Sequence, residues 1–308
     1  MTRKEILDRI KGVFVPVVTP FNTRGDLDEA GFRSNVRRYV GQGFNGILIA
    51  GSTGEGPYLT ERERMRLVEL ARPLVPAPEI LLVGTGVEAT RQTIHLSKEA
   101  LKRGADALLV LTPGYFKNRM DSAALTAHFS AVADAVQRPV LIYSIPQFTG
   151  INIDPETIAR LSRHGNIVGL KESSGNLEFL RDVLTKSKAG FRVLAGSALI
   201  MLDAFQAGAA GAVLGPANYI PDLCLGIYNR YLQGDFAGAR QVQQSILSLV
   251  QEVNVRAGIP GIKYALDLCG YRGGKPRSPL LPLSRVEGRK VAAALREVGI
   301  HPKKFQAA

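Results

Sequence analysis

Short runs of apolar residues recur along the chain, and each is followed by a loop and then by a helical pattern. The runs cover residues 13–18, 46–50, 80–83, 107–111, 140–143, 167–170, 192–195 and 211–214. Their apolar positions are nearly continuous instead of alternating with polar ones. Such runs are typical of parallel strands that other elements cover on both faces. The pattern therefore predicts eight buried strands.

The segments between the runs contain residues that favour the ends of helices. A Ser or Thr followed three residues later by Glu forms a capping box, and Asp before Pro suits the first helical turn. A Lys-Arg-Gly sequence favours the last turn, because cations and then a glycine stabilise a helix end. The examples are Thr60 with Glu63, Asp154 with Pro155, Ser284 with Glu287, and Lys102-Arg103-Gly104.

Eight such strand–helix units within the first 214 residues predict an α/β fold of the (β/α)8 barrel type. A doubly wound sheet is the alternative, but it usually has fewer strands. After residue 214 only helical patterns follow, over residues 222–233, 235–254, 258–269 and 284–298. We therefore expect residues 1–220 to form a barrel that carries the active site. Residues 221–308 are expected to form a C-terminal helical extension packed on the barrel.

Composition narrows the class of protein. The 308 residues are 45% hydrophobic and 21% charged, which suits a globular protein with a large core. No run approaches the ~18 apolar residues of a membrane span, and residues 1–5 lack the apolar segment of a secretory signal. Cys224 and Cys269 are too few for a disulfide framework, so we expect a cytoplasmic protein with no membrane partner.

The charged and metal-binding residues do not form a recognised site. The four histidines are scattered, so no bound metal is predicted. The net charge of +12 comes from basic residues spread along the chain. Their densest group, in residues 272–290, lacks the interleaved aromatic residues of a single-strand binder. A surface charge that steers anionic substrates is favoured over nucleic-acid binding, which remains an alternative.

Lys171 is the main candidate for catalysis. It ends the apolar run at 167–170 and begins a polar stretch with Glu172 and Ser173, so it stands where a buried strand would emerge at a rim. A lysine that is partly removed from water loses its proton more easily and attacks a carbonyl carbon. The alternative is a solvated lysine after a strand, which is the commoner case for an isolated lysine.

The ends of other predicted strands bring further groups to the same rim, where the active sites of such barrels lie. Gly51-Ser52-Thr53-Gly54-Glu55 predicts a carboxylate cradle, because glycines let backbone N–H groups turn inward and two hydroxyls add donors. Tyr143 suits proton transfer to a lysine-derived nitrogen. The alternatives are a capped turn for the first motif and a core-filling aromatic residue for Tyr143.

Residues 84–89 fit the GxGxxA form of the dinucleotide fingerprint. They lie in the third strand–helix unit, however, and the next strand ends at Thr112 without an acidic residue for a ribose. We therefore expect no nucleotide cofactor.

Three motifs together resemble the dihydrodipicolinate synthase/N-acetylneuraminate lyase family. They are Gly51-Ser52-Thr53-Gly54-Glu55, Tyr143-Ser144-Ile145-Pro146 with Thr149-Gly150, and Gly169-Leu170-Lys171-Glu172. The resemblance runs from about residue 12 to residue 284 in the family's order and spacing. It implies a class I, pyruvate-handling aldolase on a TIM barrel, usually a homotetramer built as a dimer of dimers.

The resemblance also implies roles for single residues. Lys171 matches the Schiff-base lysine, and Tyr143 matches the tyrosine that shuttles protons. Gly51 belongs to the motif in which Ser52 and Thr53 match the pair that holds the pyruvate carboxylate. Thr53 also matches the position that links the tyrosine into a hydroxyl relay.

Four further positions belong to the expected site. Tyr115 resembles a catalytic tyrosine that reaches across a subunit interface into the neighbouring site, and Val213 falls where the family uses a backbone carbonyl near the substrate. Ser173 lies on the same rim as Lys171. Phe148 replaces the arginine with which dihydrodipicolinate synthases grip the carboxylate of aspartate semialdehyde, and phenylalanine cannot make that bidentate contact.

The match within the family is uneven. Residues 118–125, 193–198 and 258–263 are closer to 4-hydroxy-2-oxoglutarate aldolase, which typically has asparagine in place of Thr53 and of Phe148. Sugar-acid aldolases of the family often have an apolar residue at the Phe148 position.

The main prediction is reversible aldol cleavage of a 4-hydroxy-2-oxo acid, of the 4-hydroxy-2-oxoglutarate type, to pyruvate and an aldehyde. A small 2-oxo acid is the only partner expected besides other copies of the chain. No cofactor or metal is needed, because the lysine itself is the electron sink. The alternatives are a dihydrodipicolinate synthase, a 2-keto-3-deoxy sugar-acid aldolase or dehydratase, and a non-catalytic barrel that binds a keto acid.

Overall fold

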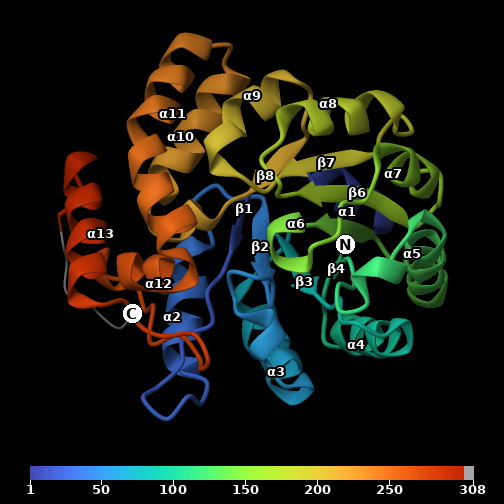
Figure 1. Ribbon diagram of the computed structural model, residues 1–308, viewed down its shortest axis with the longest axis horizontal. Helices are drawn as coiled ribbons and strands as arrows, with labels where there is room; N and C mark the ends of the chain where they lie inside the picture. Colours follow the sequence, from blue (N-terminus) through green and yellow to red (C-terminus); the bar gives the residue numbers. More distant parts are fainter. Residues whose placement is uncertain (302–308) are drawn as a thin grey trace.

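The computed structural model describes residues 1–301, and its eight parallel strands form a closed barrel (Figure 1). Each strand pairs with the next along the chain, and β8 pairs with β1. The strands are β1 (Gly12–Pro16), β2 (Gly46–Ile49), β3 (Ile80–Gly84), β4 (Ala107–Leu111), β5 (Val140–Ser144), β6 (Ile167–Glu172), β7 (Arg192–Ala195) and β8 (Gly211–Val213). The predicted barrel and its eight strands are confirmed.

Helices surround the barrel and continue beyond it. The α-helices are α1 (Arg3–Arg9), α2 (Glu29–Tyr39), α3 (Glu61–Ala71), α4 (Thr90–Lys102), α5 (Ser122–Val136), α6 (Pro146–Thr149), α7 (Pro155–Leu161), α8 (Leu177–Lys186), α9 (Met201–Gln206), α10 (Pro221–Leu232), α11 (Phe236–Val250), α12 (Gly258–Leu268) and α13 (Arg285–Glu297). The 3-10 turns are η1 (Gly56–Tyr58), η2 (Arg72–Leu74), η3 (Lys117–Arg119), η4 (Ala198–Ile200) and η5 (Gly215–Asn218), and the π-helical segment is η6 (Gln251–Arg256).

The helix ends follow the capping residues found in the sequence. Both capping boxes are formed, by Thr60 at the start of α3 and by Ser284 at the start of α13. The Asp154 side chain accepts the Thr157 N–H at the start of α7. Helix α4 ends at Lys102, and Gly104 follows with φ +99°, a conformation that favours glycine.

Two apolar cores hold the barrel together. One lies between the strands and the surrounding helices, and it includes Val15, Ile49 and Leu170. The other fills the interior of the barrel with side chains such as Phe14 and Leu141. A filled interior means that a ligand can bind only at an end of the barrel.

Helix α1 belongs to the interior core, and we did not predict it. Its Ile6 and the following Ile10 pack with the apolar side chains of the barrel interior. The Thr2 side chain and Glu5 form a capping box that starts the helix. That Thr2-to-Glu5 spacing is visible in the sequence, but the helix has only 7 residues, too short for a clear periodicity.

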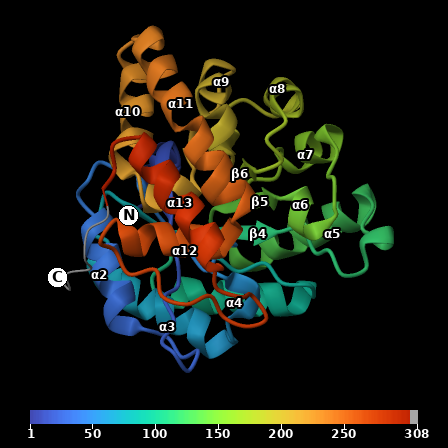
Figure 2. The ribbon, with the colours of Figure 1, turned by 60° about the vertical axis from the view of Figure 1, so that its left-hand side comes forward.

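The C-terminal helices lie close to the barrel. Helix α10 follows β8 and contacts β1, so it takes the place of an eighth surrounding helix. Helices α12 and α13 pack on each other and appear together at the front in Figure 2. The division of the chain at residue 220 into barrel and extension stays a prediction.

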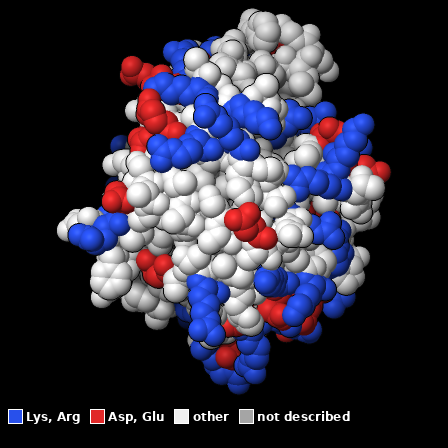
Figure 3. Space-filling model, turned by 90° about the vertical axis from the view of Figure 1, so that its right-hand side faces the viewer, with Lys and Arg blue, Asp and Glu red and all other residues white. Residues whose placement is uncertain are grey.

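The surface carries its basic residues in several separate groups. Figure 3 shows one face, on which Lys and Arg lie among Asp and Glu around a wide uncharged area. Within residues 1–301, no helix combines the length and the apolar character needed to cross a bilayer.

Candidate active site

Lys171 and Tyr143 lie side by side at the C-terminal end of the barrel. They pair directly in the register of β5 and β6, and each is only 4% exposed. The Lys171 Nζ lies 4.2 Å from the centre of the Tyr143 ring. Within residues 1–301, this amine has no hydrogen bond or ion pair, so it is available to a ligand.

An irregularity in β6 turns Lys171 toward the barrel interior. Val140 pairs with Ile167, but Leu141 pairs with Gly169, so Val168 is an extra residue opposite β5. Side chains alternate between the faces of a strand, and one extra residue reverses which of the following residues face inward. Lys171 therefore shares the inner face with Tyr143.

Glu172 follows Lys171 but does not neutralise it. Alternation along β6 sends the Glu172 side chain to the opposite face. Its Oε1 accepts the Ser174 N–H at 2.6 Å, while its buried Oε2 has no partner among the described residues. Burial raises the pKa of this carboxyl above its usual range.

A serine hydroxyl connects Tyr143 with the loop after β2. The Ser52 Oγ lies 3.3 Å from the Tyr143 phenol oxygen. Thr53 lines the same cavity as Ser52. The resemblance implied that the Thr53 hydroxyl contacts Tyr143, but in the structure this contact is made by the Ser52 hydroxyl.

Buried polar contacts hold this loop in place. Glu55 has a left-handed backbone (φ +54°), a conformation that costs free energy for a residue with a side chain. Its carboxylate accepts the Lys263 ammonium at 2.5 Å and the Arg277 backbone N–H at 2.7 Å. The Thr19 hydroxyl donates to the Gly54 carbonyl at 2.7 Å. The strained loop is therefore fixed by Thr19 from the loop after β1 and by residues from the C-terminal region.

Lys263 is an unusual buried cation. Its side chain and that of Glu55 are each 1% exposed, and its Nζ also donates to the Thr19 carbonyl at 2.9 Å. Burial lowers the pKa of Lys263, and the Glu55 carboxylate opposes this effect. The pair belongs to the support of the loop, because Lys263 does not line the cavity.

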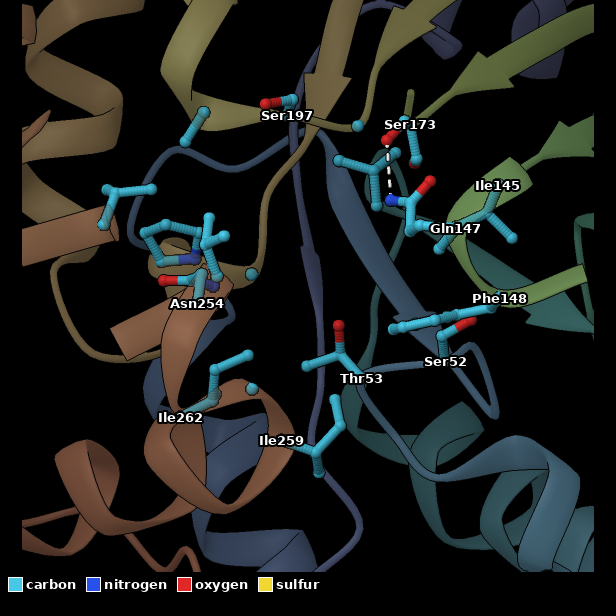
Figure 4. A pocket seen from close by; sticks show the side chains of 18 of the residues that line it. Ser52, Thr53, Ile145, Gln147, Phe148, Ser173, Ser197, Asn254, Ile259 and Ile262 are labelled. Carbon is cyan, nitrogen blue, oxygen red and sulfur yellow. Dashed lines mark hydrogen bonds between the residues drawn. The ribbon is translucent and has the colours of Figure 1, made fainter. Parts of the chain in front are cut away.

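Lys171 and Tyr143 line a cavity of about 170 Å³. Figure 4 shows this cavity from close by. Ser52 and Thr53 lie on its walls, and Asn254 and Ile262 stand across from Gln147 in the view of Figure 4. This volume suits a small organic acid and is too small for a dinucleotide.

Three further expected residues also line this cavity. They are Phe148 on α6, Ser173 after β6 and Val213 at the end of β8. A Cβ on Gly196 would stand 1.8 Å from the Ser173 Oγ, so only glycine leaves room for the serine. The Phe148 side chain is 66% exposed at the mouth.

Gly51 and Tyr115 do not line this cavity. The Gly51 carbonyl accepts the Gly56 N–H at 3.0 Å, and Gly51 lines a second cavity beside it. Tyr115 is 78% exposed on the loop after β4, where Glu88 accepts the N–H groups of Gly114 and Tyr115. The role that the resemblance implies for Tyr115 would require a second copy of the chain.

Several lining residues were missed by sequence reasoning. They are Gln147, Asn254, Ile259 and Ile262. Asn254 belongs to η6, and π-helical turns are frequent at functional sites. No periodicity in the sequence distinguishes such a turn from the surrounding helix. Gln147 comes four residues after the predicted strand at 140–143 and could have been included.

The glycines of the GxGxxA match have a packing role. A Cβ on Gly84 would meet the Ala50 carbonyl at 2.4 Å, and one on Gly86 would meet the Leu111 nitrogen at 2.2 Å. Neighbouring backbone therefore explains both glycines. The described residues also contain no group of three or more His, Cys, Asp or Glu placed to hold a metal ion.

Comparisons with known proteins agree on one family. A model of the dihydrodipicolinate synthetase family matches residues 9–298. The 4-hydroxy-tetrahydrodipicolinate synthase of Agrobacterium fabrum is 35% identical over 94% of this chain and 99% of its own length. Dihydrodipicolinate synthase from Thermotoga maritima is 29% identical, with a TM-score of 0.90 over 94% of this chain and 99% of that one.

A third protein was solved with a ligand. YagE, a prophage protein of the dihydrodipicolinic acid synthase family from E. coli K12 in complex with pyruvate, is 28% identical. It superposes with a TM-score of 0.89 over 94% of this chain and 99% of that one.

Proposed function

This chain belongs to the dihydrodipicolinate synthetase family, and we propose that it catalyses reversible aldol cleavage of a 4-hydroxy-2-oxo acid to pyruvate and an aldehyde. The family membership makes the protein a lyase of the class I aldolase type, which uses a Schiff-base lysine. The observation that carries the proposal is the buried Lys171 amine beside the Tyr143 ring, in a small cavity that is also lined by the hydroxyls of Ser52 and Thr53.

Imine formation begins the reaction. The uncharged Lys171 amine adds to the C2 ketone, and a proton passes from nitrogen to oxygen to give a carbinolamine. Tyr143 then donates its phenol proton to the C2 hydroxyl, which leaves as water. A protonated imine and a Tyr143 phenolate remain, so the charges balance.

Carbon–carbon cleavage uses the phenolate as the base. Tyr143 takes the proton of the C4 hydroxyl, the C3–C4 bond breaks, and its electron pair moves toward the imine to form an enamine. The C4 fragment leaves as an aldehyde. Tyr143 next protonates C3, and water adds to C2 while the phenolate takes its proton. Collapse of this carbinolamine releases pyruvate and the free amine.

Substrate orientation falls to the loop after β2. Ser52 and Thr53 bring two hydroxyl donors to the cavity beside Lys171, where they suit the C1 carboxylate. Fixing that carboxylate places the C2 ketone near the amine, which reduces the entropy lost on reaching the transition state. The contact of the Ser52 hydroxyl with Tyr143 supports a path for protons. Thr53, on the same loop, assists this proton transfer.

A second candidate function is that of the relatives. Curated relatives of this chain, among them those of Fervidobacterium nodosum and Agrobacterium fabrum, are named 4-hydroxy-tetrahydrodipicolinate synthase, and the similarity of these two covers 94% of it. Phe148 argues against this activity, because it leaves no guanidinium for the carboxylate of aspartate semialdehyde. A sugar-acid aldolase and a non-catalytic barrel are the remaining alternatives.

Reductive trapping tests the mechanism. With pyruvate and borohydride, we expect the mass of the chain to increase by one reduced pyruvate adduct, and peptide mapping should locate it on Lys171. Lys171→Met should abolish the adduct, while the matched change Lys188→Met, on the exposed loop before β7, should leave it intact. An adduct elsewhere, or none, would contradict the mechanism and favour the non-catalytic barrel.

A further inference from the structure

The outer part of the active-site cavity is mainly apolar. Beyond Lys171, Tyr143 and the two hydroxyls of the loop after β2, its walls come from the loops after β6 and β7, which carry Ser173 and Ser197, and from α6, η4, η5, α11, η6 and α12. The apolar side chains there are Phe148, Leu199, Pro216, Val250, Val255, Ile259 and Ile262. Because C2 of the substrate is bonded to Lys171, the part of the substrate beyond C3 must extend toward these residues.

Lys171 is the one charged side chain among the lining residues that the structure describes. The polar groups of the outer part are neutral, and some are already engaged. Gln147 donates its Nε2 to the Ser173 carbonyl at 2.8 Å, shown as the dashed line in Figure 4. The Asn254 Oδ1 accepts the Tyr219 phenol. None of these groups supplies a cation for a second carboxylate.

The positive charge of the bound intermediate is already matched by anions without a second carboxylate. The protonated imine on Lys171 carries one positive charge, while the C1 carboxylate and the Tyr143 phenolate each carry one negative charge. A further carboxylate would lose its hydration among apolar side chains and gain no cationic partner, which is strongly unfavourable.

Two apolar side chains at the mouth are left exposed to solvent. Phe148 is 66% exposed and Val255 is 55% exposed, although both belong to the cavity wall. Contact with an apolar substituent would remove this surface from water, which favours binding. The mouth is therefore complementary to hydrocarbon.

We propose that the aldehyde half of the substrate is uncharged and carries an alkyl or aryl group that packs against Phe148 and the apolar wall of η6 and α12. This inference rests on the proposed aldol function and specifies its substrate class. It departs from the substrate type predicted from the sequence, 4-hydroxy-2-oxoglutarate, whose second fragment is the anion glyoxylate.

The test compares aldehydes of matched size in the synthetic direction. Pyruvate consumption is measured with pentanal, benzaldehyde and succinic semialdehyde, the last of which resembles pentanal in length but ends in a carboxylate. We expect kcat/KM for pentanal or benzaldehyde to exceed that for succinic semialdehyde and glyoxylate at least about 100-fold, because an apolar pocket already discriminates about 100-fold against an added hydroxyl and a carboxylate is harder to desolvate.

A charge introduced at the mouth should reverse this preference. Phe148→Arg is expected to lower kcat/KM for pentanal and to raise it for succinic semialdehyde, because the guanidinium supplies the missing partner. Leu281→Arg is the matched control, since Leu281 is 76% exposed and does not line the cavity, and it should change neither value.

The outcomes separate the two proposals. If pyruvate traps on Lys171 but anionic aldehydes are preferred, the substrate class is wrong and the aldolase proposal stands. If Phe148→Arg leaves the ratio of the two aldehydes unchanged while trapping is normal, the role of the mouth is overturned. If pyruvate does not trap, the aldolase proposal itself fails.

Discussion

The proposed chemistry depends on what each of three side chains contributes at the rim. Lys171 supplies a buried amine without a hydrogen-bonding partner in residues 1–301, Tyr143 supplies a phenol against which that amine packs, and Ser52 contacts the phenol oxygen at 3.3 Å. The ring of Tyr143 also belongs to the interior core, so its position does not depend on a ligand.

Tyr143→Phe therefore separates the contribution of the hydroxyl from that of the ring. The ring should still pack beside Lys171, but proton transfer is lost, so we expect kcat to fall about 10²–10³-fold with little change in unfolding temperature. Ser52→Ala should lower kcat less, by about 10-fold, because the phenol remains. Tyr264→Phe on α12, outside the cavity, is the control for removing a hydroxyl. An unchanged kcat in Tyr143→Phe would remove this residue from the proton path.

At the scale of elements, segments distant in the sequence support the loop that carries Ser52. Arg277 donates its backbone N–H to Glu55, and its guanidinium holds both carboxylate oxygens of Glu63 at 2.6 and 2.8 Å. The same guanidinium donates to the Tyr58 and Gly25 carbonyls. One residue after α12 thus connects the loop after β1, the loop after β2 and the start of α3.

This connection predicts a pH-dependent stability. The Arg277 guanidinium lowers the pKa of Glu63 to about 2 from an ordinary value of 4.5. Because the folded-state pKa is depressed, the contribution is complete above the unfolded pKa and is lost as the pH falls toward 2. Glu63→Gln should lower the free energy of unfolding at pH 7 by on the order of 2 kcal/mol, and its difference from wild type should shrink below pH 4.5.

Urea unfolding at pH 7, 5 and 3.5 measures this effect. Glu178→Gln, on the exposed first turn of α8, is the matched control and should change the free energy little at any pH. A difference between Glu63→Gln and wild type that stays constant with pH would show that the ion pair does not supply the stability.

At the scale of the whole molecule, one end of the barrel is closed and the other is open. Ile6 and Ile10 extend the interior core, while the cavity lies at the strand ends that carry Lys171. On the rim near this open end, Tyr115 and Phe116 are 78% and 70% exposed and pack edge to face. Exposed aromatic pairs of this kind favour protein interfaces.

We therefore predict that copies of the chain associate through this pair. Sedimentation should show a species larger than a monomer, which we expect to be a tetramer, and Tyr115→Ser with Phe116→Ser should shift it toward smaller species and lower kcat. Leu281→Ser is the control for removing an exposed apolar side chain. A wild-type protein that sediments as a monomer would refute the association. The cytoplasmic location stays a prediction as well.

The sequence by itself determined the barrel and much of the active-site rim. Eight apolar runs and helix caps are local features, because each depends on residues close together in the chain. The strand ends therefore identified Lys171, Tyr143 and Ser52 as neighbours in one fold. The same reasoning missed α1, since its role appears only where Ile6 meets the barrel interior.

Only the tertiary structure decided how these groups meet. The extra Val168 in β6 sets the face on which Lys171 lies, and the register with β5 brings it beside Tyr143. Tyr143 contacts Ser52, which lies 91 residues away in the chain. Asn254 comes from a still more distant segment and lines the same cavity. Such contacts arise from packing between distant segments, and no local pattern of residues encodes the distance between two side chains.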